Sequence, residues 1–193
     1  MIKNIKDSIN STISVLNDIC KNEELLNQVV QSVDIICDSF KSSGKILFCG
    51  NGGSAADAQH FAAELTGRFM FDRDPLSAEA LHANTSYLTA VANDYSFDAI
   101  FSRLVQAKAV KGDVLFAIST SGNSKNIVNA INQALKQNVS VIGLTGGTGG
   151  LMSDICDVCI KVPSVVTPRI QEGHVVIGHL ICELVEKDMF GDR

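Results

Sequence analysis

The sequence predicts an α/β fold, a single domain built on a parallel sheet with helices on both of its faces. Short apolar runs alternate with helical stretches from residue 45 onward, and this alternation is typical of parallel sheets that helices cover on both sides. The 193 residues are 46% hydrophobic and 19% charged, a composition that suits one globular core. No linker, repeat or low-complexity segment interrupts the chain, so we expect one domain over residues 1–193.

Two amphipathic helices are expected before the first strand, over residues 2–20 and 23–40. In each of them apolar residues recur at spacings of three and four, which is the period of a helix face. The apolar positions of the first helix are Ile2, Ile5, Ile9, Ile13, Leu16 and Ile19. Because such faces need a partner, we expect residues 1–43 to contribute contacts between subunits.

Five buried strands and five further helices are expected after this pair. The strands are predicted at 45–50, 76–82, 113–120, 139–146 and 157–163, where the chain is continuously apolar. The helices are predicted at 55–69, 85–92, 97–110, 123–137 and 169–189. Ligands of such folds bind beyond the carboxyl ends of the strands.

The loop after the first strand is rich in glycine, with the sequence CGNGGSAA. It fits the loose dinucleotide spacing G-x-G-x-x-A, but a second strand with an acidic end about 20 residues on is missing, and no Walker G-K-[ST] follows. Ser54 and Asp57 fit a capping box, so a helix is expected to begin directly after Asn51, Gly52 and Gly53. Its N–H groups favour anions or sugar hydroxyls. A tight turn that only needs glycine is the structural alternative.

His60 and Glu64 lie four residues apart in the helix that follows, and this spacing places both on one face. The pair suits a metal site or an acid–base pair. A lone histidine among small residues is more often a core group with a satisfied partner, so the spacing alone leaves both interpretations open.

The loop after the third strand, STSGNS, carries four hydroxyl side chains in six residues, Ser119, Thr120, Ser121 and Ser124. Hydroxyls and N–H groups at a helix N-terminus favour a phosphate group. An ordinary helix cap is the alternative, but a cap needs only one hydroxyl. The last helix also carries polar residues in an apolar run, and buried polar groups need partners: Gln171, Glu172, His174 and His179.

Charge and cysteine content narrow the function classes. The net charge is −5, and residues 1–40 contain three Lys, no Arg and six acidic residues, which argues against nucleic acid and anionic membranes as partners. The N-terminus lacks the apolar run of a signal peptide, and the six scattered Cys are typical of a reducing compartment, so we expect a cytoplasmic protein. Cys156 and Cys159 form a C-x-x-C, but a strand would place them on opposite faces, and we interpret both as core thiols.

Four motifs taken together resemble the sugar isomerase (SIS) domain family and, within it, the phosphoheptose isomerases: NGGSAADAQHFAAEL, ANDYSFDAIFSR, STSGNS and TPRIQEGHVVIGH. The resemblance covers essentially the whole chain. It implies a flavodoxin-like sheet of five strands and a homotetramer. It also implies conversion of sedoheptulose 7-phosphate to D-glycero-D-manno-heptose 7-phosphate, the first step toward ADP-heptose for lipopolysaccharide core or other surface glycans.

The same resemblance implies site residues. One zinc ion per subunit would be held at the matching positions His60, Glu64, Gln171 and His179. The phosphosugar would contact Asn51, Gly52, Gly53, Glu64, Asn93, Asp94, Ser119, Thr120, Ser121, Ser124 and Gln171. The chain departs from its relatives at Asn84, where they often carry Asp; the departure leaves open a tuned sugar preference or no effect.

A non-catalytic SIS protein that binds the bacterial replication initiator is the alternative from another functional class. Such proteins share the glycine loop but lack the acid one turn after the first histidine and the histidine of the last helix. This chain keeps both, as Glu64 and His179, which favours an enzyme. SIS transcription regulators add a basic DNA-binding domain, which the acidic first 40 residues cannot form.

The reaction that the resemblance implies needs a base for a carbon-bound proton and a proton donor for the sugar oxygens. We assign Glu64 as the base and His179 as the acid and proton shuttle. If both bind zinc tightly, neither is free for this work, and the sequence leaves the role of zinc open as catalytic, structural or inhibitory.

The spacing of two proposed ligands predicts a shared site. Gln171 and His179 are eight residues apart on one helix, so their Cα atoms are about 12 Å apart, and helical side chains lean toward the N-terminus. One metal held by both requires either a helix break near Gly173 or Gly178, or ligands from two subunits. We favour the second alternative, an active site at a subunit interface.

Overall fold

The computed structural model describes residues 1–191 and contains one parallel five-stranded sheet with the order β2-β1-β3-β4-β5. The strands are β1 (Ile46–Gly50), β2 (Ala78–Ala80), β3 (Val114–Ser119), β4 (Ser140–Gly146) and β5 (Val158–Val162). This is the flavodoxin-like order, so the predicted fold class is confirmed. Strand β2 is shorter than expected, because only three of its residues pair with β1.

Seven α-helices surround the sheet within the described residues, and all lie where the sequence predicts them to within a few positions. They are α1 (Ile2–Lys21), α2 (Glu23–Lys41), α3 (Gly53–Thr66), α4 (Thr85–Asp94), α5 (Ile100–Lys108), α6 (Lys125–Lys136) and α7 (Thr167–Phe190). Two 3₁₀ turns, η1 (Phe97–Ala99) and η2 (Gly150–Asp154), complete the order. None of these helices combines the length and apolar composition that crossing a membrane requires.

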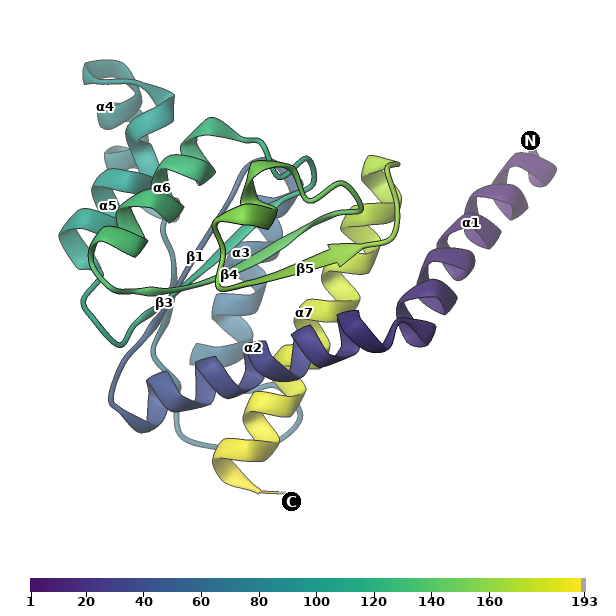
Figure 1. Cartoon of the computed structure of the whole chain (residues 1–193), viewed down its shortest axis with the longest axis horizontal. Helices are drawn as coiled ribbons and strands as arrows, with labels where there is room; N and C mark the ends of the chain where they lie inside the picture. Colours follow the sequence, from purple (N-terminus) through teal and green to yellow (C-terminus); the bar gives the residue numbers. More distant parts are fainter. Residues whose placement is uncertain (192–193) are drawn as a thin grey trace.

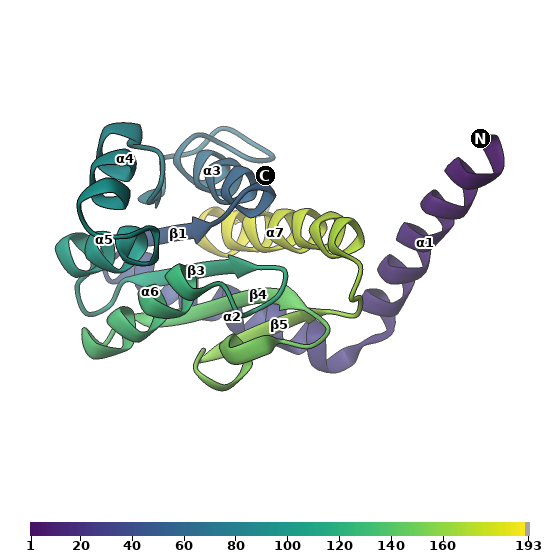
Figure 2. The ribbon, with the colours of Figure 1, turned by 90° about the horizontal axis from the view of Figure 1, so that it is seen from above.

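Helices cover both faces of the sheet, and each face has its own apolar core (Figures 1 and 2). Along β1, Ile46 and Phe48 pack with α2, α3 and α7, while Leu47 and Cys49 pack with α5 and α6. Strand side chains alternate between faces, and here both faces are buried. The strands are therefore continuously apolar in sequence instead of alternating with polar residues.

Helix α1 projects from the body of the molecule (Figure 1). Its C-terminal part is packed, with Val15 and Ile19 buried, but Ile2, Ile5 and Ile9 are 71%, 53% and 54% exposed. The middle of α1 is joined to α7 by a hydrogen bond, in which the Thr12 hydroxyl donates to Glu172 Oε2 over 2.7 Å. The apolar stripe found in the sequence thus has no partner along much of its length in the described single chain.

The C-x-x-C pair is arranged differently from our expectation. Cys156 lies in a bend before β5, not inside the strand, so the alternation that should separate it from Cys159 does not apply. Both side chains pack in the core on the α5 and α6 face, and both are free thiols. A side chain on Gly143 would contact both sulfurs. The interpretation as packed thiols holds, but the reason for it was wrong.

His174 is a fully buried histidine on α7 whose Nε2 lies 3.1 Å from the Thr145 carbonyl oxygen. Burial lowers the pKa of this imidazole from 6.5 to about 4. Because the folded pKa lies below the unfolded one, the contribution of His174 to stability is complete above about pH 6.5 and is lost as the pH falls toward 4.

Lowering the pH from 7.5 to 5 should therefore decrease the free energy of unfolding by about 2 kcal/mol through this residue alone. His174→Gln keeps a side-chain N–H donor but does not titrate, so its pH dependence should be smaller by that amount. Urea unfolding of both proteins at the two pH values measures the difference. Equal pH dependence in the two proteins would contradict a neutral buried His174.

Candidate functional site

The candidate site lies along the contact between α3 and α7, which run side by side in the same direction. A Cβ atom on Gly53, the first residue of α3, would collide with the side-chain amide of Gln171 near the start of α7. About two turns further along both helices, His60 meets His179, with their Nε2 atoms 2.8 Å apart. The helix pair thus brings predicted residues from distant parts of the chain together.

His60, Glu64 and His179 form one polar cluster on this helix pair. Glu64 Oε1 lies 3.5 Å from His60 Nδ1, and His179 lies at the other ring nitrogen of His60. The side chains of His60 and Glu64 are 45% and 23% exposed, so solvent and a substrate reach them. The i and i+4 spacing seen in the sequence therefore belongs to an accessible polar cluster and not to a core histidine.

The cluster has the donor types that zinc prefers, two imidazoles and a carboxylate. In the described part of the chain, however, no group of three or more His, Cys, Asp or Glu side chains is arranged to hold a metal ion. The reason is that Glu64 and His179 contact opposite ring nitrogens of His60. The donor chemistry fits zinc, whereas the side-chain arrangement would have to change for Glu64 to join the two histidines as a ligand.

Helix α7 is continuous from Thr167 to Phe190, so the alternative of a helix break near Gly173 or Gly178 is wrong. Gly173 and Gly178 allow close packing instead: a Cβ on Gly173 would collide with Val162, and one on Gly178 would collide with the Phe61 ring. Gln171 therefore stays at Gly53, and within one chain it lies apart from the pair formed by His60 and His179.

The glycine loop starts α3 without a side-chain cap. Gly52 is the N-cap residue, with φ +56°, and the helix begins at Gly53. The predicted capping box is therefore wrong, because Ser54 lies inside the first turn, where it is buried. Burial raises the pKa of Asp57, its expected partner, to about 6. The N-cap residue of α3 therefore gives the helix no side-chain hydrogen bond.

Asn51 links the glycine loop to the second predicted loop. Its side-chain amide exchanges two hydrogen bonds of 2.9 Å with the amide of Asn126 on α6. Asn126 is buried and also accepts from the Ile127 N–H. The sequence analysis missed Asn126, because its local sequence pattern does not predict a hydrogen-bond partner 75 residues away. The Asn51 side chain thus positions the two loops relative to each other.

The serine cluster (Ser119, Ser121 and Ser124) gathers at the carboxyl end of β3. Ser119 Oγ lies 3.0 Å from Ser124 Oγ and 3.4 Å from Ser121 Oγ. Ser124 is the N-cap residue of α6, yet its hydroxyl makes no capping hydrogen bond. Three hydroxyls therefore converge at an uncapped helix N-terminus, which is the arrangement that phosphate groups favour.

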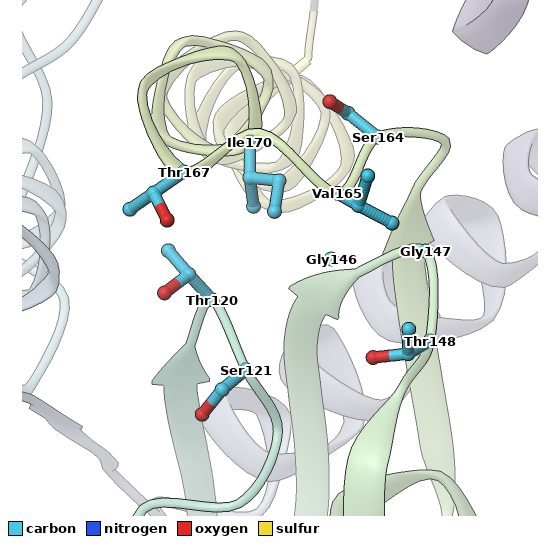
Figure 3. Close-up of a pocket in the computed structure, with 9 residues that line it drawn as sticks. All are labelled: Thr120, Ser121, Gly146, Gly147, Thr148, Ser164, Val165, Thr167 and Ile170. Atoms are coloured by element: carbon cyan, nitrogen blue, oxygen red, sulfur yellow. The ribbon is translucent and has the colours of Figure 1, made fainter.

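A cavity of about 120 Å³ adjoins this cluster, between the carboxyl ends of β3 and β4 and the start of α7 (Figure 3). Thr120 and Ser121, two of the residues predicted to bind the phosphosugar, line it. Its other hydroxyl side chains were missed by the sequence reasoning, and they are Thr148, Ser164 and Thr167. The rule that ligands bind at strand ends could have identified Thr148, because it follows the end of β4 by two residues.

Two residues predicted to bind the substrate do not line the cavity beside the serine cluster. Asn93 and Asp94 end α4, are exposed, and are bonded to each other over 2.9 Å. Helix α4 stands apart from α7 in both views of the chain (Figures 1 and 2). Asn84, the departure noted in the sequence, is the N-cap of α4, where its side chain accepts from the Tyr87 N–H. Its side chain thus has a structural role here.

His82, whose role the sequence left open, lies in a second cavity that borders the glycine loop. This cavity also measures about 120 Å³, and Asn51, Phe97 and Phe101 contribute to its walls. Burial lowers the pKa of His82, so its ring is neutral near pH 7. The residue is therefore placed beside a predicted binding segment.

The comparisons with known proteins agree on one family. The SIS domain family matches residues 9–146. Phosphoheptose isomerase 2 of Campylobacter jejuni is 49% identical over 187 residues, which are 97% of this chain and 93% of that protein. A phosphoheptose isomerase of Rhodospirillum rubrum is 57% identical over 158 residues, which are 82% of this chain and 84% of that protein.

A solved structure supports the same assignment. Phosphoheptose isomerase from Neisseria gonorrhoeae superposes with a TM-score of 0.90 at 41% sequence identity, covering 96% of this chain and 98% of that one. The superposition spans nearly the whole of both chains, so the two proteins share the fold. The chain therefore belongs to the SIS domain family and, within it, to the phosphoheptose isomerases.

Proposed function

We propose that this protein converts sedoheptulose 7-phosphate to D-glycero-D-manno-heptose 7-phosphate. The observation that carries the proposal is the accessible cluster of His60, Glu64 and His179 on the same helix pair whose amino end faces the glycine loop. An acid–base cluster of this kind is what an aldose–ketose isomerisation needs. The relatives with 46–57% identity are named phosphoheptose isomerases, so the replication-initiator-binding alternative is not favoured.

The serine cluster is the proposed phosphate site. Its hydroxyls lie at the N-terminus of α6, where hydroxyl donors and the helix dipole both favour an anion. The phosphate does not react in this isomerisation. Its binding energy would instead hold the sugar chain in place for the chemistry at the other end of the substrate.

The proposed chemistry moves hydrogen between C1 and C2 of the sugar. The Glu64 carboxylate would take the proton from the carbon next to the carbonyl group and return it to the neighbouring carbon. His179 would exchange a proton with the sugar oxygens. Its Nε2 lies 2.8 Å from Nε2 of His60.

Zinc is the proposed cofactor, at one ion per subunit. His60 and His179 are the two ligands that the geometry supports best, since their Nε2 atoms face each other. When bound there, zinc would stabilise negative charge that develops on a sugar oxygen. Glu64 and Gln171 complete the ligand set that the resemblance implies.

A homotetramer with shared sites is the proposed assembly. The exposed isoleucines of α1 form an apolar stripe that a neighbouring subunit would cover. Because α7 is continuous, Gln171 of the same chain stays at the glycine loop. We therefore propose that any Gln171 ligand comes from a neighbouring subunit. A cytoplasmic location and a supply of precursor for ADP-heptose are proposed with the function.

Glu64→Gln tests the base. The substitution keeps size and polarity but removes the carboxylate, so kcat for sedoheptulose 7-phosphate should fall by about 10²-fold or more. Circular dichroism checks that the fold is intact. A kcat within about threefold of the parent would refute the assignment. A parallel assay of the parent with a chelator, and after zinc is restored, measures whether the ion takes part in turnover.

The serine cluster is tested with Ser121→Ala combined with Ser124→Ala. Each lost hydrogen bond to a charged phosphate is worth about 1.5–3 kcal/mol, so KM for the phosphosugar should rise at least tenfold. Zinc content, measured on the same preparation, should not change. An unchanged KM would place the phosphate elsewhere.

Mixed oligomers test the shared site. Inactive Glu64→Ala and Gln171→Ala chains, dissociated and reassembled together, should regain activity, because sites built on the Gln171→Ala chain receive Gln171 from the neighbour. The mixture of Glu64→Ala with His179→Ala should stay inactive, since His60, Glu64 and His179 come from one chain. Recovery of activity in the second mixture would contradict this division of ligands. Absence of recovery in both mixtures, despite confirmed mixed oligomers, would also contradict it.

A further inference from the structure

We propose that the buried ion pair between Arg73 and Glu186 positions Glu64 and His179 for catalysis. The pair anchors the connecting segment (residues 67–77), which joins α3 to β2. One partner of the pair holds the end of α3 that carries Glu64, and the other holds a phenylalanine against His179. The inference rests on the catalytic roles proposed above for these two residues.

Arg73 binds the carboxyl end of α3. Its side chain is fully buried, and Nη2 donates to the Glu64 carbonyl oxygen over 2.8 Å. Nη1 donates to the carbonyl oxygens of Leu65 and Gly67, over 2.7 and 2.9 Å. The last carbonyls of a helix have no partner within it, so one guanidinium group fixes the turn from which the Glu64 side chain extends.

Glu186 holds the other part of the connecting segment. Its Oε1 accepts from Arg73 Nε and from the Phe69 N–H, over 3.0 and 2.9 Å, and its Oε2 accepts from the Met70 N–H over 2.7 Å. The side chain is 1% exposed. Burial alone would raise the pKa of Glu186, but these hydrogen bonds and the Arg73 charge outweigh it and keep the pKa below its usual value.

Phe69 carries the effect to the candidate site. Its ring centroid lies 5.6 Å from that of His179, whose ring also contacts His60 at 5.0 Å. Glu186 follows His179 by seven residues on α7, two helix turns, so both lie on one side of that helix. The carboxylate thus fixes the backbone of the residue whose ring limits the orientations of His179.

A purely stabilising role explains this arrangement poorly. Replacing a buried ion pair by apolar residues is often neutral or favourable, because removing two charges from water is costly. What such a pair does well is to fix geometry, and here both of its partners bind backbone next to proposed catalytic side chains. A displacement of about 1 Å in a catalytic group can reduce a rate about 10²-fold.

The chain contains a matched control in Asp113. This carboxylate is also 1% exposed and accepts from two backbone N–H groups, those of Lys45 and Val110, and from the Lys45 ammonium group. It lies at the amino end of β3, the opposite end of the strand from the serine cluster. Asp113→Asn should therefore destabilise the fold as Glu186→Gln does, without a route to His179.

The experiment compares Glu186→Gln with Asp113→Asn in the full-length protein. With Glu186→Gln, kcat for sedoheptulose 7-phosphate should fall about tenfold or more while KM stays within about threefold. In spectra of protein labelled at histidine Cε1, which contains four histidines, the His179 signal should move because the Phe69 ring shifts. Asp113→Asn should leave kcat within about twofold of the parent value. It should also leave the His179 signal at the parent position within experimental error.

A His179 signal at the parent position in Glu186→Gln, or a kcat equal to that of Asp113→Asn, would overturn the proposal. If Glu186→Gln does not fold, Phe69→Leu decides, because it leaves the ion pair intact and removes only the ring. It should move the His179 signal and lower kcat, and parent values for both would overturn the proposal. Absence of turnover in the parent would refute the proposed substrate, while the histidine spectra would still test the positioning.

Discussion

The close contact between α3 and α7 is the constraint on which the candidate site depends. Residue 178 has no side chain, and a Cβ atom there would collide with the Phe61 ring. Since protein interiors tolerate little overlap, glycine at this position lets α7 lie directly against α3. The next residue, His179, then reaches His60. The contact between His60 and His179 thus follows from one place where two parallel helices pack without an intervening side chain.

The binding segments are joined to this helix pair through backbone and amide contacts. The amide exchange between Asn51 and Asn126 fixes the glycine loop to the amino end of α6, and the serine cluster lies at the same end of α6. Gln171 lies on Gly53, at the other side of the glycine loop. The glycine loop therefore contacts both the element that carries the serine cluster and the start of α7.

The sequence was most informative where the signal is local. The apolar runs and helical stripes predicted the strands and helices, because backbone hydrogen bonding and burial impose periods that repeat along the chain. Predictions that depended on where an element begins were weaker. Ser54 became a residue of the first turn of α3 because Gly52, with its positive φ, is the N-cap. Cys156 came to share a face with Cys159 because β5 begins only at Val158.

The sequence by itself determined the fold class, the candidate loops and the residue types of the site, since periodicity and the spacing of His60 and Glu64 are local properties. Only the tertiary structure decided which of these residues meet. It placed His179 against His60 and Gln171 against Gly53. Asn93 and Asp94 instead lie on α4, where they are hydrogen-bonded to each other. It also revealed the pair formed by Arg73 and Glu186, 113 residues apart. Contacts over such separations follow from how helices pack on the sheet, and no local pattern encodes them.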